Sequence, residues 1–276
     1  MMKKTKLLVI ILLTLYSQIF AISPANPNNF KDILLNLDFN NLPSGLYARK
    51  DFVKDWNNPA WNNGFDESRI FVVQDSDNPS SKCLKVLIPK GAVGPNEGGA
   101  NWPCKFKRNY NEIYCAYRVK FGNKFDFVHG GKLPGLYGGE NLWGRIPNGS
   151  DGWNAMIMWL DNGVATQYIY HPDQPEIWGE RFGWEDSNGE VRFKANNWYQ
   201  IEERVVMNTP NKKDGVFQVW LNKRLILDLH HLRFRNTTKL AIDSFYFVTF
   251  FGGNDATWAT NKDEYVYFDD ILIKGK

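Results

Sequence analysis

Apolar and polar positions alternate in short runs along much of this chain. Beyond residue 33, runs rich in aromatic and branched side chains are separated by clusters of Gly, Asn, Asp and Pro. Successive side chains of a β-strand point to opposite faces, so a period of two predicts half-buried strands. In the segment 153–159, apolar side chains share one face, and Asn154 and two methionines share the other. We expect strands at 34–39, 69–74, 82–88, 113–121, 153–160, 165–171, 198–207, 215–221, 224–229, 242–251 and 264–274.

Short turns between these runs favour antiparallel pairing. The segment 221–224 (LNKR) is typical of a hairpin turn between two apolar runs. We find no convincing long amphipathic helix, internal repeat or flexible linker. The sequence therefore predicts an all-β fold, a two-sheet antiparallel β-sandwich of the jelly-roll kind, with one domain over residues 22–276.

One stretch departs from this alternation of apolar and polar positions. Residues 130–148 (GGKLPGLYGGENLWGRIPN) are far richer in Gly than their neighbours. We expect a long loop here, and loops of this length are usually functional.

The first 21 residues have the pattern of a secretory signal peptide. A basic stretch precedes the apolar run 7–15, and the small residue Ala21 offers a cleavage point. The run is short for a membrane span, although an uncleaved anchor is the alternative, and no later segment is long and apolar enough. We expect a mature protein that is secreted or periplasmic, without membrane attachment after cleavage, and monomeric.

Composition narrows the class of partner. The 276 residues hold 33 basic and 30 acidic side chains, and three lysines of the leader account for the excess. A formally neutral mature chain argues against general nucleic-acid binding. The three cysteines, Cys83, Cys104 and Cys115, permit one disulfide of undetermined pairing with one thiol left over, and no Cys/His motif indicates zinc.

Candidate chemistry centres on a lysine and two tyrosines. Lys132 has glycines on both sides, which allow a ligand to approach closely, although it could equally be a solvated lysine. Tyr168 and Tyr170 share one strand face, as core or surface tyrosines also would. Asn154, on a neighbouring expected strand, could direct an amide to the same cleft.

Other candidates are cationic or polar. Arg118 shares a strand face with Tyr114 and Lys120, which could form a cationic surface for an acidic sugar or be ordinary solvated charge. His129 precedes the glycine-rich stretch and His171 follows the tyrosine pair. A single histidine is more often structural, and each could instead line the site.

The familiar hydrolase patterns are missing. No strand carries the closely spaced carboxylates of a retaining glycosidase, and no G-x-S-x-G or HExxH occurs. A lysine, two phenols and an amide suit β-elimination from a uronate instead. That reaction needs a group that neutralises the carboxylate, a base for the adjacent proton and an acid for the leaving oxygen, but no cofactor.

Several blocks of the sequence resemble those of a known enzyme family. Six sequence blocks together resemble polysaccharide lyase family 14, the alginate lyases. They are GGKLPGLYGG (130–139), YIYHP (168–172), WYQIEERVVMNTPNKKDG (198–215), VFQVW (216–220), FFGGND (250–255) and YVYFDDIL (265–272). The related family 20 glucuronan lyases look similar. The resemblance spans roughly residues 66–276. It implies a jelly roll whose concave sheet binds an acidic polysaccharide, with Lys132, Tyr168 and Tyr170 as catalytic residues and Asn154 in the substrate site. We place Gln218, in the VFQVW block, among the substrate-binding candidates.

One position departs from the family pattern. Met156 stands where the family has an arginine, two residues after the small polar residue. This departure motivates an alternative, a non-catalytic protein that binds acidic carbohydrate through its many aromatic side chains. A structural β-sandwich without a ligand is a weaker alternative.

A structural calcium ion is a further expectation. Asp269, in the YFDD segment, resembles a calcium ligand of many jelly rolls and would pair with oxygens near the first strand, such as Asp38. Solvent-facing acids at a strand end are the alternative. Overall we expect a secreted lyase that cleaves a 1,4-linked polyuronate, alginate or glucuronan, by β-elimination.

Overall fold

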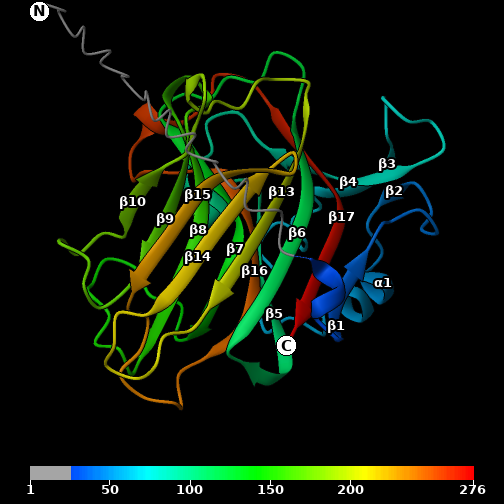
Figure 1. Ribbon diagram of the computed structural model, residues 1–276. Coiled ribbons are helices and arrows are strands. Elements are labelled where there is room, and N and C mark those ends of the chain that lie inside the picture. Colours follow the sequence, from blue (N-terminus) through cyan, green and yellow to red (C-terminus); the bar gives the residue numbers. More distant parts are fainter. Residues whose placement is uncertain (1–25) are drawn as a thin grey trace, which may run out of the picture.

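Two antiparallel β-sheets lie face to face in a computed structural model that describes residues 26–276 (Figure 1). The predicted signal peptide, residues 1–21, lies outside the described residues. The six-stranded sheet has the order β10 (Glu180–Gly183), β9 (Ala165–Tyr170), β8 (Gly152–Leu160), β7 (Gly130–Gly139), β16 (Ile242–Phe251) and β5 (Ala100–Tyr110).

The nine-stranded sheet lies in front of it in Figure 1. Its order is β15 (Arg224–Leu232), β14 (Gly215–Leu221), β13 (Trp198–Val206), β6 (Glu112–Phe121), β17 (Glu264–Gly275), β4 (Lys82–Ile88), β3 (Ile70–Gln74) and β2 (Gly45–Leu46), with β1 (Asp32–Leu37) also paired to β17. The remaining elements are α1 (Arg49–Asp55), α2 (Gly94–Glu97), the small hairpin β11 (Glu185–Asp186) and β12 (Gly189–Glu190), and the 3₁₀ turns Pro27–Asn29, Asp161–Gly163 and Ala256–Trp258.

The core fills the space between the two sheets. Inward side chains of both sheets form one large apolar cluster, in which Trp102, Trp159 and Phe217 are fully buried. Burial of aromatic side chains on this scale is the main stabilising contribution to such a fold. The predicted all-β, antiparallel two-sheet jelly roll is confirmed.

Each expected strand has a counterpart in the structure. The hairpin at 221–224 is also confirmed, because β14 and β15 pair there and Asn222 and Lys223 both have positive φ angles, of 50° and 69°. Two adjacent residues of positive φ give the turn whose twist matches that of the flanking strands.

The prediction of a long loop at 130–148 is wrong for its first half, because residues 130–139 form β7. Strand neighbours approach so closely there that only glycine fits. A Cβ at Gly135 would lie 1.9 Å from the Ala155 carbonyl oxygen, and one at Gly138 would lie 1.6 Å from that of Ala241. The glycines therefore allow close backbone packing within the sheet, and the loop itself begins after Gly139.

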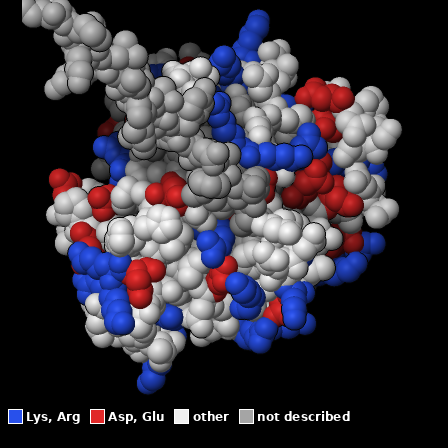
Figure 2. All heavy atoms as spheres, in the orientation of Figure 1, with Lys and Arg blue, Asp and Glu red and all other residues white. Residues whose placement is uncertain are grey.

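The cysteines and surface charges complete the description. Cys83, Cys104 and Cys115 are buried and free, so the disulfide that the sequence permits does not form in this structure. No helix within residues 26–276 is long and apolar enough to span a bilayer. In Figure 2, basic and acidic side chains both appear across the visible face rather than forming one continuous basic surface.

Candidate active site

Lys132, Tyr168 and Tyr170, which the sequence analysis proposed as catalytic residues, lie on the outer face of the six-stranded sheet. On β7, Leu133 and Leu136 point into the core, so Lys132 points outward. The alternation on β8 and β9 places Met156, Met158, Tyr168 and Tyr170 on the same outer face, in two small apolar clusters separate from the main core. Three adjacent strands thus bring Lys132 to the tyrosine pair.

Lys132 is held in an apolar and aromatic environment. Its Nζ lies 3.7 Å from the centroid of the Tyr168 ring, 5.7 Å from that of Trp143, and 3.1 Å from the Met158 sulfur. No carboxylate pairs with this ammonium group among the described residues. Burial, and to a smaller extent the positive charge of nearby Arg181, together lower the pKa of Lys132 to about 7. A large fraction is therefore neutral near neutral pH and able to accept a proton.

The two phenols form a unit beside this amine. Their hydroxyl oxygens are 3.4 Å apart, and the rings meet edge to face at 5.4 Å between centroids. The Gly179 backbone N–H donates to the Tyr168 hydroxyl at 3.1 Å, and the Gly144 N–H donates to the Tyr170 hydroxyl at 3.2 Å. Burial raises the pKa of Tyr168, and its contact with Tyr170 raises it too. Tyr168 therefore stays protonated at neutral pH and can donate a proton.

The Asn154 side chain holds the loop that follows β7. Its side chain is fully buried, and its Nδ2 donates to the Leu142 carbonyl at 2.8 Å and to the Asn141 Oδ1 at 3.2 Å. These bonds fix the loop that carries Trp143 over Lys132. The Asn154 Nδ2 is thus used to hold the loop, and its Oδ1 has no hydrogen-bond partner among the described residues.

Met156 lies in the middle of the sheet face. It is fully buried against an apolar wall that contains Tyr137, Tyr246, Val248 and Phe250. In the register of the sheet it sits opposite Tyr168 on one side and Gly135 on the other. No cationic side chain occupies this point.

Arg181 is a site residue that the sequence reasoning missed. It lies on the four-residue edge strand β10, directly opposite Tyr168, so its side chain shares the outer face with the catalytic candidates. It is exposed, and it forms no ion pair with any residue in the described part of the chain. The strand is too short for alternation to reveal it, and only its pairing with the tyrosine strand locates it.

The two histidines lie outside the lysine–tyrosine cluster. His129 is exposed at the start of β7, with Nδ1 3.2 Å from an Asp161 carboxylate oxygen. His171 is buried beside Phe182, on the core side of the sheet, with Nε2 2.7 Å from Glu180. Burial lowers the pKa of His171. Both contacts are structural.

Arg118 and Gln218 are not brought to this site, because they lie on the nine-stranded sheet. Arg118, on β6, is 3.5 Å from both Asp269 and Asp270. Gln218, on β14, accepts a hydrogen bond from Arg204 and donates one to Asp228. The structure therefore does not bring these two substrate-binding candidates to Lys132 and the tyrosine pair, because sheet membership depends on pairings between distant strands.

The two residues proposed for calcium differ in exposure. Asp38 is exposed and accepts a hydrogen bond from the Asn40 backbone, while Asp269 is buried. Burial raises the pKa of Asp269 to about 7, and repulsion by Asp270 raises it too. Within residues 26–276, no group of three or more His, Cys, Asp or Glu side chains could hold a metal ion. A structural calcium ion at Asp38 and Asp269 stays a prediction.

Comparison with known proteins places the chain in a class of polysaccharide-cleaving lyases. A family model, polysaccharide lyase 14, matches residues 76–271, and the chain belongs to that family. No curated protein matches the chain. Membership supports polysaccharide lyase activity.

Several solved lyase structures are also similar to this chain. The alginate lyase Aly36B is 27% identical, with a TM-score of 0.75, and the match covers 87% of this chain and 96% of that one. The PL-14 alginate lyase from Aplysia kurodai is 25% identical, with a TM-score of 0.72, over 89% and 100% of the two chains. The endo-β-1,4-glucuronan lyase from Trichoderma reesei shares the fold at 13% identity, with a TM-score of 0.53, over 80% and 92%.

Proposed function

We propose that this protein is an alginate lyase that cleaves its polymer by β-elimination. The observation that carries the proposal is the pairing of a buried amine, whose pKa is about 7, with two hydrogen-bonded phenols on one sheet face. A base and an acid of suitable pKa, held side by side, are the requirement for this reaction.

The proposed steps follow from the geometry. Neutral Lys132 removes the proton from the carbon beside the uronate carboxylate, and the electrons of that C–H bond form a carbon–carbon double bond. The bond to the glycosidic oxygen then breaks, and a phenol of the Tyr168–Tyr170 pair donates a proton to this leaving oxygen. Solvent later removes the proton from the ammonium group and returns one to the phenolate. No cofactor enters this sequence.

The carboxylate must be neutralised before the adjacent proton can be removed. We assign this role to Arg181, since a guanidinium binds a carboxylate through two parallel hydrogen bonds. Its position opposite Tyr168, without an acidic partner in the described residues, supports the assignment. Such a contact stabilises the charge that develops in the transition state.

Alginate is the favoured polymer because of the relatives. Two variants of Aly36B, one with a lysine and a methionine replaced by alanine and one with a lysine and a tyrosine replaced, were solved with an alginate trisaccharide and tetrasaccharide. The replaced methionine and tyrosine have the same separation along that chain as Met156 and Tyr170 here. The lysine and methionine are 28 positions apart in that chain and 24 apart here, so the match covers the methionine–tyrosine spacing alone. That spacing supports a working site in which Met156 replaces the arginine expected from the family pattern.

The test is product formation. Residues 22–276 are mixed with polymannuronate, polyguluronate, alginate and glucuronan, and the ultraviolet absorbance of the unsaturated product end is followed. We expect a rise with an alginate polymer. A rise with glucuronan alone would show that glucuronan, not alginate, is the substrate. Binding without any product would favour the non-catalytic carbohydrate-binding alternative.

We also propose that residues 1–21 direct export and that the mature protein acts as a monomer outside the cytoplasm.

A further inference from the structure

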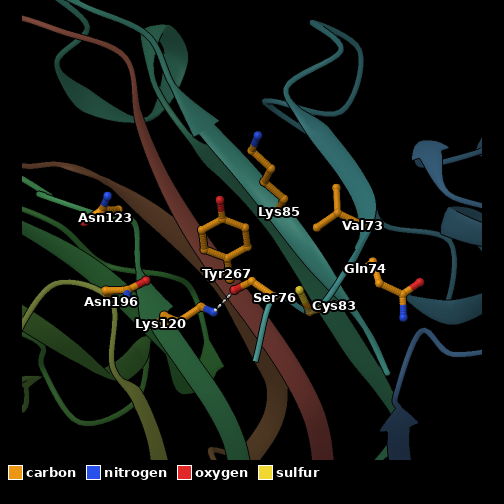
Figure 3. Close-up of a pocket in the computed structure, with 9 residues that line it drawn as sticks. All are labelled: Val73, Gln74, Ser76, Cys83, Lys85, Lys120, Asn123, Asn196 and Tyr267. Carbon is orange, nitrogen blue, oxygen red and sulfur yellow. Dashed lines mark hydrogen bonds between the residues drawn. The ribbon is translucent and has the colours of Figure 1, made fainter. Parts of the chain in front are cut away.

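A second cavity lies on the opposite side of the sandwich from the catalytic cluster. It has a volume of about 400 Å³ and opens on the outer face of the nine-stranded sheet. Figure 3 shows Tyr267 at its centre, Asn123 and Asn196 on one side, and Lys85 and Gln74 on the other. Small-molecule sites usually have volumes in the range of roughly 300–1,000 Å³.

A row of paired residues crosses four adjacent strands at this cavity. In the sheet register, Lys85 on β4 faces Tyr267 on β17, Tyr267 faces Lys120 on β6, and Lys120 faces Trp198 on β13. Directly opposite residues of an antiparallel pair project from the same face. Cationic and aromatic side chains therefore alternate across the sheet, and the nitrogen of Lys120 lies 5.5 Å from the Tyr267 centroid and 5.0 Å from that of Trp198.

The two lysines differ in their partners. Lys120 is buried, and its ammonium group contacts Asp77 at 3.1 Å, the Ser76 hydroxyl at 3.0 Å and Asp75 at 3.5 Å, so its charge is balanced within the protein. Lys85 forms no ion pair within residues 26–276, and its Nζ lies 3.7 Å from the Tyr265 ring centroid. Lys85 therefore remains available to an anionic group of a ligand.

The other lining groups suit a sugar. Asn123 and Asn196 are exposed and carry amides, which can donate to and accept from sugar hydroxyls. The Gln74 nitrogen already donates to the carbonyls of Pro79 and Ser81, so Gln74 offers its amide oxygen as an acceptor. The half-buried Tyr267 ring offers an apolar surface with a polar hydroxyl tip, as aromatic side chains at binding surfaces commonly do. A uronate residue combines these features, because it has hydroxyls, an apolar ring face and one carboxylate.

We propose that this cavity is a non-catalytic binding site for a uronate segment of the polysaccharide substrate. The Tyr267 ring supports the sugar, the amides bind its hydroxyls, and Lys85 binds its carboxylate. The inference rests on the proposed alginate lyase function for the identity of the polymer. Because the site lies on the other sheet, polymer held there leaves the catalytic cleft free and raises the local concentration of cleavable chain.

Binding stoichiometry tests the proposal. An alginate tetrasaccharide is titrated calorimetrically into the Lys132→Ala variant, which prevents turnover. We expect two sites per chain in this background and one after addition of Lys85→Ala or Tyr267→Ala. Lys50→Ala, an exposed lysine on α1, is the matched control and keeps two sites. A single site in the Lys132→Ala background, or two sites in both added variants, overturns the proposal.

Steady-state kinetics provide a second readout, which does not depend on the count of binding sites. In otherwise wild-type enzyme, Lys85→Ala should raise KM for the polymer by about threefold to tenfold, and by less for the tetrasaccharide, because only a long chain bridges both sites. Equal effects on the two substrates contradict the proposal. The lyase function has a separate readout, since absence of ultraviolet product with any polyuronate refutes it even where binding at Tyr267 persists.

Discussion

The ammonium group of Lys132 lies 3.7 Å from the centroid of the Tyr168 ring, and Tyr168 in turn contacts Tyr170 through its hydroxyl. Sequence positions 36 residues apart are thus brought together by the pairing of β7, β8 and β9. The arrangement places a proton acceptor and a proton donor on the same side of the sheet. Our predictions test whether these groups work as that geometry implies.

Replacement of Lys132 should remove catalysis without loss of the fold. Lys132→Met preserves an unbranched side chain of similar length in an apolar environment, so the variant should fold normally. Loss of the base should lower kcat by about 10²-fold to 10⁴-fold. The ultraviolet product assay measures this loss, and circular dichroism provides the check on folding. A Lys132→Met enzyme with near wild-type kcat would exclude Lys132 as the base.

The pH dependence of kcat/KM should reflect the protonation state of Lys132. Lys132 accepts a proton only when neutral, and its pKa is about 7. We therefore expect kcat/KM to rise with pH through about 7 and then level off, since this quantity reports pKa values of the free enzyme. Measurement of initial rates from pH 5 to 9 decides the point. A profile that keeps rising toward pH 10 would indicate an amine of ordinary pKa.

Arg181→Ala should produce two separate changes. Loss of the carboxylate contact should lower kcat/KM by about tenfold to 100-fold, in line with charged hydrogen bonds of about 1.5–3 kcal/mol. Removal of a positive charge near Lys132 should also raise the Lys132 pKa, so the acidic limb of the pH profile moves to higher pH. Arg181→Lys keeps the charge, so its limb should stay near that of the wild type. A simple structural role for Arg181 would leave the limb unmoved in both variants.

The tyrosine pair should behave as one functional unit. The Tyr168→Phe and Tyr170→Phe variants each remove one hydroxyl of a contact 3.4 Å long. We expect each to reduce kcat, and the double variant to lose little more than the more damaged single variant, because groups that act together are not additive. The measurement is a double-mutant cycle on kcat. Fully additive losses would mean that the two hydroxyls act independently.

The sequence predicted what depends on local alternation. A period of two placed Tyr168 and Tyr170 on one face and identified eleven strands, although not β5 or β7, and the hairpin turn followed from residue types at 221–224. Lys132 was found by its glycine context, although its segment was interpreted as a loop. The glycine content predicted a loop that a ligand can approach closely, whereas Gly135 and Gly138 allow close contact between neighbouring strands.

Non-local pairing explains what the sequence did not predict. Arg118 and Gln218 have suitable chemistry, but β6 and β14 pair into the opposite sheet. Arg181 stands on a strand of only four residues, which is too short to show a period. Its relevance depends entirely on its register with Tyr168. Which strands pair with which is a property of the folded chain that alternation within a single strand does not encode.

A buried carboxyl group inside the sandwich should make stability depend on pH. Glu203, on β13, is fully buried, and neither of its oxygens has a hydrogen-bond partner among the described residues. Burial raises its pKa to about 8, partly offset by the side chain of Gln167. Gln167 donates to the Met156 carbonyl at 3.1 Å, so this pair lies directly beneath the catalytic strands.

The sign of the effect follows from proton binding. The unfolded chain ionises Glu203 near its ordinary pKa of about 4.3, while the folded protein keeps it protonated up to about pH 8. The stabilising contribution is complete below the unfolded pKa and is lost as pH rises toward 8. Glu203→Gln removes this titration. Its unfolding free energy, relative to wild type, should therefore increase by up to about 1.4 kcal/mol per pH unit across this window. Urea unfolding at pH 5 and pH 8 measures the difference, and Glu176→Gln, at an exposed carboxylate, is the control. A difference between Glu203→Gln and wild type that is the same at both pH values would show that Glu203 has no raised pKa in the folded protein.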